Sequence, residues 1–116
     1  MRTVFIGTTP QQLSAPNATR KFWTLEFTPS SIVAGNTGHV FVGRGFIPSA
    51  TIGSPDQGDV LNAGAAIVED MNFNGDPGVY KGAIWAVADT VGQQCTYDEQ
   101  RADDSGASPS PTQAGS

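Results

Sequence analysis

Short segments in which apolar and polar residues alternate recur along the middle of the chain and predict β-strands. The clearest segment has Trp23, Leu25 and Phe27 on one face of an extended strand and Thr24 and Glu26 on the other. Each such segment ends at a cluster of Gly, Pro, Asn or Ser residues, which favour turns. The predicted strands are residues 20–28, 32–34, 39–45, 60–61, 65–68, 83–88 and 93–98.

About seven or eight short strands with turns at intervals of about ten residues predict an all-β fold, an antiparallel β-sandwich or jelly roll. In residues 83–88, Trp85 and Val87 share one face of the expected strand, and Ile84 lies on the other. Because apolar residues flank both tryptophans, we expect Trp23 and Trp85 to be buried.

The two ends of the chain lack this pattern. Residues 1–19 mix short apolar pieces with Thr and Gln, and Pro10 and Pro16 argue against a helix, so we expect an extended arm or an edge strand. Residues 102–116 are rich in Ser, Pro and Gly and have almost nothing to bury, which predicts a C-terminal tail without a fold of its own. A β-sandwich body at 20–101 lies between them.

Composition and charge narrow the class further. The 14 Gly and 8 Pro residues disfavour helices. The net charge is −5 with no basic cluster, so the chain is not expected to bind nucleic acid. No apolar run approaches the ~20 residues of a membrane-spanning helix. The first seven residues also predict no signal peptide.

The sequence offers few groups for chemistry. Cys95 is the single cysteine, so no internal disulfide or cysteine metal site is expected, as suits assembly in a reducing compartment. His39 is the single histidine, and no Gly-x-Ser-x-Gly motif accompanies it. Asp56 and Asp59 form a carboxylate pair in the sequence, but we expect them to be solvated loop residues. We therefore expect a non-enzymatic protein without a cofactor.

One segment copies the opening of a calcium-binding loop. Its ligand positions are Asp70, Asn72, Asn74 and Asp76. The position that should carry a bidentate Glu is Lys81, which repels a cation. We therefore interpret the segment as a turn between strands and expect no bound metal.

Partner contacts are predicted in the N-terminal arm and at aromatic residues that face outward or lie in loops. The candidate contact residues are Arg2, Val4, Phe5, Ile6, Leu13, Phe22 and Phe73.

Four motifs resemble small β-sandwich virion proteins of tailed bacteriophages, over roughly residues 15–98. They are Asn-Ala-Thr-Arg-Lys at 17–21, Val-Phe-Val-Gly-Arg-Gly at 40–45, Gly-Asp-Val-Leu-Asn-Ala-Gly at 58–64 and Pro-Gly-Val-Tyr-Lys-Gly-Ala-Ile-Trp-Ala at 77–86. In the family the last motif begins Gly-Pro, whereas here the order is Pro-Gly. The segment at 48–58 is also longer.

The resemblance implies a capsid decoration (cement) protein, or a head-fibre-like one. Such a protein is assembled in the host cytoplasm and lies on the outside of the virion. Its expected partners are the major capsid protein and itself, as a dimer or trimer. The alternatives are a neck, tail or fibre accessory protein and, from another class, a carbohydrate-binding module. On the decoration hypothesis, deleting 1–19 or 102–116 should weaken particle binding while the body stays folded.

Overall fold

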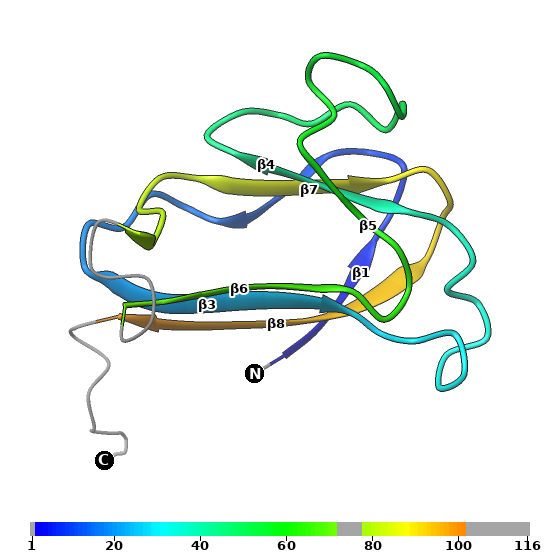
Figure 1. The fold of residues 1–116 in the computed structure, drawn as a ribbon, viewed down its shortest axis with the longest axis horizontal. Coiled ribbons are helices and arrows are strands. Elements are labelled where there is room, and N and C mark those ends of the chain that lie inside the picture. The colour runs from blue at the N-terminus through cyan, green and yellow to red at the C-terminus, as the bar shows by residue number, and fades with distance from the viewer. Residues whose placement is uncertain (1, 72–77, 102–116) are drawn as a thin grey trace.

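The computed structural model describes residues 2–71 and 78–101, and they form two antiparallel four-stranded sheets that face each other (Figure 1). The strands are β1 (Arg2–Ile6), β2 (Gln11–Ser14), β3 (Arg20–Phe27), β4 (Val40–Arg44), β5 (Asp59–Leu61), β6 (Ala66–Asp70), β7 (Ile84–Ala88) and β8 (Gln93–Arg101).

We call the two layers the β1 sheet, with strand order β1-β8-β3-β6, and the β2 sheet, with order β2-β7-β4-β5. Consecutive strands alternate largely between layers, which gives the crossover pattern of an eight-stranded jelly roll. The predicted all-β sandwich is therefore confirmed.

The core lies between the sheets and is built from alternate residues of each strand. Trp23, Leu25 and Phe27 of β3 are fully buried, as the alternation predicted. From the facing sheet, Val40, Val42 and the small residues of β7 pack against them. The predicted burial of Trp23 is thus confirmed.

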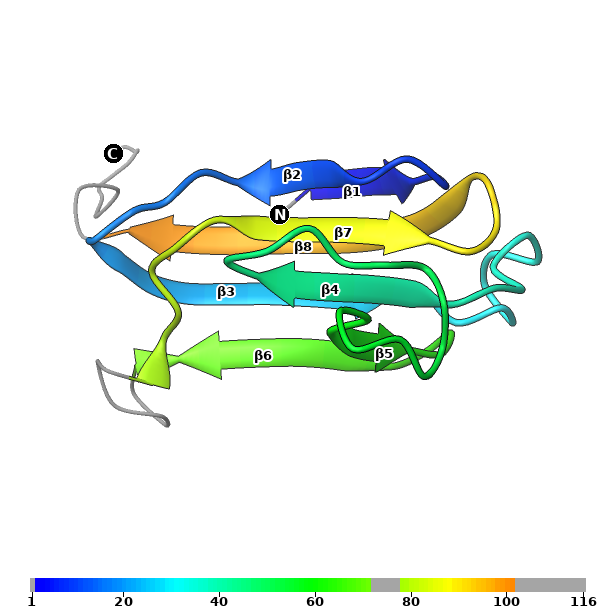
Figure 2. The same cartoon turned by 90° about the horizontal axis from the view of Figure 1, so that it is seen from above.

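The N-terminal residues do not form a projecting arm. β1 pairs with β8 and β2 pairs with β7, so each is an edge strand of one layer (Figure 2). Val4, Ile6 and Leu13 point inward and are buried. The two prolines do not interrupt these strands, because Pro10 lies in the connection before β2 and Pro16 follows β2. The edge-strand alternative is correct, and the extended arm is wrong.

The β2 sheet is buried on its outer face as well. Figure 1 shows the β4–β5 connection, residues 45–58, lying over this sheet. Beneath it Phe41 and Val87 are buried outside the main core. Trp85 shares this outer face and is only partly buried, which corrects the expectation of full burial.

Residues 32–34 form a turn instead of the predicted strand. The backbone N–H groups of Ile32 and Val33 both donate to the Pro29 carbonyl oxygen, at 3.0 Å. The apolar run there was too short to distinguish a strand from a turn after Pro29-Ser30-Ser31.

Candidate functional site

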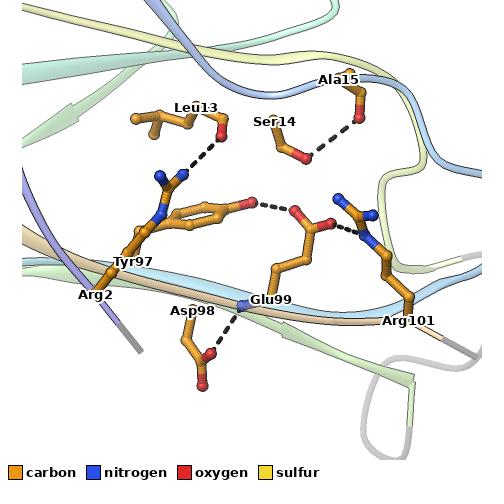
Figure 3. Close-up of a pocket in the computed structure, with 8 residues that line it drawn as sticks. All are labelled: Arg2, Leu13, Ser14, Ala15, Tyr97, Asp98, Glu99 and Arg101. Atoms are coloured by element: carbon orange, nitrogen blue, oxygen red, sulfur yellow. Dashed lines mark hydrogen bonds and ion pairs between the residues drawn. The ribbon is translucent and has the colours of Figure 1, made fainter. Parts of the chain in front are cut away.

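A polar cavity of about 480 Å³ opens between the two sheets at the edge where β1 and β2 lie. Figure 3 shows its lining side chains, which come from β1, from β2 and the residue after it, and from the C-terminal half of β8. β1 is shorter than β8, and its register ends at the pair Arg2↔Tyr97. The rest of β8 therefore faces the cavity. The lining residues are Arg2, Leu13, Ser14, Ala15, Tyr97, Asp98, Glu99 and Arg101.

Glu99 is the central charged group of the cavity. Its carboxylate accepts hydrogen bonds from the Tyr97 hydroxyl at 2.6 Å and from Arg101 Nε at 2.8 Å. Arg20 Nε lies 3.4 Å from the same carboxylate. Burial alone raises the pKa of Glu99, but hydrogen bonds from Ser14, Tyr97 and Arg101 and the charge of Arg20 outweigh it and lower that pKa to about 2.

Arg20 is a fully buried guanidinium that joins four parts of the chain. Its Nη1 donates to the carbonyl oxygens of Tyr80 and Gly82 at 2.7 and 3.0 Å. Its Nη2 donates to Ser14 Oγ and to the Ala15 carbonyl oxygen, both at 2.8 Å. Arg20 lies on β3 of the β1 sheet and Ser14 on β2 of the other sheet, so their hydrogen bond connects both sheets at this end of the sandwich, and the ion pair with Glu99 adds β8.

The charged groups of the cavity therefore bind one another, an arrangement that stabilises the fold and is poorly suited to proton transfer. A carboxylate with a pKa near 2 is a weak base at neutral pH. Burial, reinforced by the hydrogen bond and negative charge of Glu99, raises the pKa of Tyr97 well above its ordinary value, so its hydroxyl stays neutral. Arg2 is committed too, because its Nη2 donates to the Leu13 carbonyl oxygen at 3.0 Å.

A second ion cluster joins the sheets near the opposite edge. Glu69 accepts from Trp23 Nε1 at 2.7 Å and from Arg44 Nη1 at 2.6 Å. Arg44 also donates to Asp59 at 2.8 Å, and its guanidinium lies 5.7 Å from the Trp23 ring centroid. Trp23 is thus held by the hydrogen bond from its indole N–H to Glu69 and by the Arg44 guanidinium over its ring.

The sequence candidates for chemistry do not come together. His39 pairs with Asp89, at 2.8 Å between Nδ1 and Oδ2, on the partly exposed surface. Asp59 forms an ion pair with Arg44, whereas Asp56 accepts a hydrogen bond from Ser54. The two carboxylates therefore have different partners and do not form a pair. Within residues 2–71 and 78–101, no three His, Cys, Asp or Glu side chains are grouped to hold a metal ion. Cys95 is buried, and burial raises the pKa of its thiol to about 12.

The predicted calcium-loop residues are only partly covered by the structure. Asp70 is the last residue of β6, whereas Asn72, Asn74 and Asp76 lie outside the described residues. Phe73, a predicted contact residue, lies outside them as well.

Of the other predicted contact residues, Arg2 lines the cavity, and the rest separate into two groups. Val4, Ile6 and Leu13 are core residues, so their assignment as partner contacts is wrong. Phe5 is 63% exposed on the outer face of the β1 sheet, and Phe22 lines a second pocket together with acidic residues.

Three exposed apolar side chains were not among the residues predicted to contact a partner. Phe46, Ile47 and Ile52 are all exposed large side chains of the β4–β5 connection. A signal existed, because three large apolar residues stand among Gly, Ser, Pro and Thr in a segment that the strands do not include. Periodicity gave no reason to assign them to a surface.

Comparison with protein-family models, with curated proteins and with solved structures finds no match for this chain. Among the residues that the structure describes, no helix has the length and apolar character to span a membrane.

Proposed function

We propose that this chain is a non-enzymatic decoration protein of a tailed-bacteriophage head, and that its β4–β5 connection contacts the major capsid protein. The observation that carries the proposal is that three exposed large apolar side chains, Phe46, Ile47 and Ile52, all belong to one connection whose start rests on the sandwich. Several exposed large apolar side chains on one surface segment are typical of protein–protein contacts.

The connection is held firmly enough to present these side chains. The Ser49 N–H donates to the Asp56 carbonyl oxygen at 2.8 Å, which closes the segment on itself. Pro48 is buried, and a Cβ at Gly43 of β4 would meet Phe46 O and Pro48 Cδ, so the start of the connection rests directly on the sheet. A preordered contact surface loses less conformational entropy on binding.

The expected affinity of one copy is modest. Full burial of an Ile or Phe side chain contributes about 1.5 to 3 kcal/mol, from which the cost of association is subtracted. Many copies on a symmetric shell compensate for weak individual contacts. The resemblance of four sequence motifs to tailed-phage virion proteins supports the same function.

The test is to add the protein to undecorated source particles and to measure its copy number relative to the major shell protein by quantitative mass spectrometry. We expect the wild type to approach the shell protein in number. Ile52→Asp should lower the affinity about 30-fold, because charging an anchor residue costs about 2 kcal/mol or more.

Val91→Asp is the matched control, because Val91 is similarly exposed, at 71% against 61% for Ile52, and lies in the β7–β8 turn. Equal loss in both variants would contradict a specific role of the connection. A handful of copies per particle would instead favour a neck or tail location, and complete absence would reject the virion function and favour the carbohydrate-binding alternative.

A further inference from the structure

The four edges of the two sheets differ in how well they are protected against pairing with another strand. Unprotected edges expose backbone N–H and C=O groups that can pair with a further strand. β5 is only three residues long. β2 has a register shift between Gln12 and Ser14, which breaks its regular edge. The β6 edge carries Asp70 and lies beside Glu26 of β3, and like charges there disfavour self-pairing.

β1 lacks these protections. It is a regular five-residue strand without proline, and within the described residues its only strand neighbour is β8. On the outer face, its neighbours in β8 are the uncharged residues Gln94 and Thr96. The one charged side chain of β1, Arg2, turns inward to Leu13 and Tyr97.

The hydrogen-bond pattern identifies the residues that face the open edge. The Thr28 N–H donates to the Gln94 carbonyl oxygen at 3.3 Å, so Gln94 directs its backbone groups toward β3. Backbone groups alternate in direction along a strand, and Cys95 therefore directs its groups toward β1 and its partner Val4. It follows that Thr3 and Phe5 direct theirs away from the sheet.

We infer that a second copy of this chain pairs with β1 through this edge, antiparallel, with the two-fold axis beside Val4. In this register Thr3 of each copy pairs with Phe5 of the other, and each pair exchanges two backbone hydrogen bonds. The two β1 sheets become one continuous sheet across the dimer. This inference does not depend on the proposed function.

Neighbouring registers are less favourable. An axis beside Phe5 would place Thr3 opposite Gly7, but Gly7 already accepts a hydrogen bond from the Ala88 N–H, at 2.8 Å, in the other sheet. The axis beside Val4 uses both open residues and requires nothing from Gly7. The edge is thus complementary to itself, which is why the occupant is a second copy.

The side chains support the same arrangement. Phe5 is 63% exposed on the outer face, an unusual position for a large aromatic ring. Diagonal neighbours across an antiparallel pair lie about 7 to 8 Å apart, within reach of aromatic side chains. The two Phe5 rings of the dimer therefore contact each other, and the two Arg2 residues lie at opposite ends of the strand pair.

The test is sedimentation analysis of the full-length chain, without capsid, at concentrations up to about 1 mM, because such a small contact gives a weak dimer. We expect a concentration-dependent species of twice the 12.1 kDa chain mass. Hydrogen exchange of the Thr3 and Phe5 amides should slow as this species forms. A chain that stays monomeric throughout this range would overturn the inference.

Two variants locate the contact. Phe5→Asp places carboxylates at the centre of the pair and should weaken dimerisation at least about tenfold. Thr3→Pro removes an N–H that faces solvent in the monomer, a position where an edge strand tolerates proline, and should have the same effect. Val68→Asp on the β6 edge is the matched control, since Val68 is 57% exposed on the same face. Dissociation by Val68→Asp alone would refute β1 pairing.

Discussion

At the residue scale, Arg20 and Glu99 show how a charged pair becomes part of a sandwich interior. The two Nη atoms of Arg20 each donate to two acceptors. Both carboxylate oxygens of Glu99 accept a hydrogen bond. Buried ions stabilise a fold only when their remaining hydrogen-bonding capacity is used in this way. The alternation in β3 drew attention to its apolar face, whereas the burial of Arg20 depends on carbonyl groups 60 residues away.

The pKa of Glu99 predicts a specific pH response. A carboxyl group whose pKa falls from 4.5 to about 2 on folding stabilises the protein above pH 4.5, and this contribution is lost as pH falls toward 2. Glu99→Gln cannot ionise. Urea unfolding should show that the wild type loses about 2 kcal/mol more than the variant between pH 6 and pH 3. Equal losses in both proteins would show that Glu99 is not the group responsible.

At the element scale, apolar periodicity located six strands but could not assign every face. Residues 20–28, 39–45, 60–61, 65–68, 83–88 and 93–98 correspond to β3, β4, β5, β6, β7 and β8. In β7 the main core contains Ile84, Ala86 and Ala88, whereas Trp85 and Val87 face the β4–β5 connection. A strand with apolar neighbours on both sides has no polar face to orient it. β1 and β2 were harder still, because each presents only one or two inward apolar residues.

The β4–β5 connection depends on two glycines in different ways. Gly53 and Gly58 both have positive φ, of 89° and 71°. A Cβ at Gly58 would overlap the Val42 carbonyl oxygen, whereas nothing lies within 4 Å of a Cβ at Gly53. Gly53→Ala should therefore cost about 1 kcal/mol for its backbone conformation. Gly58→Ala should cost about 3 kcal/mol, since the overlap adds strain.

Urea unfolding of the two glycine variants measures this difference directly. Gly53→Ala serves as the control for the backbone conformation alone. If both variants lose the same stability, contact between Gly58 and β4 does not hold the connection against the sheet.

At the scale of the whole molecule, the N-terminal residues belong to the sandwich, although residues 1–19 were predicted to be an extension of a body at 20–101. The N-terminal residues supply one edge strand to each layer and bury Val4, Ile6 and Leu13. Their role depends on pairing with β8 and β7, at the other end of the chain. Such long-range pairing leaves little local signal in a short Thr- and Pro-containing segment. The predicted boundary after residue 101 stays a prediction, because residues 102–116 lie outside the described residues.

Two truncations test how much each end of the chain contributes to stability. Deleting residues 1–19 removes β1 and β2, leaves the edges of β8 and β7 unpaired and removes the Ser14 and Ala15 acceptors of Arg20. We expect this variant to lose its cooperative unfolding transition in circular dichroism, contrary to the expectation that the body folds without its first residues. Deleting 102–116 removes a segment with almost no apolar side chains. It should change the free energy of unfolding by less than about 0.5 kcal/mol. A cooperative transition in the first variant would show that the sandwich closes without its edge strands, and loss of stability in the second would show that the C-terminal segment packs on it.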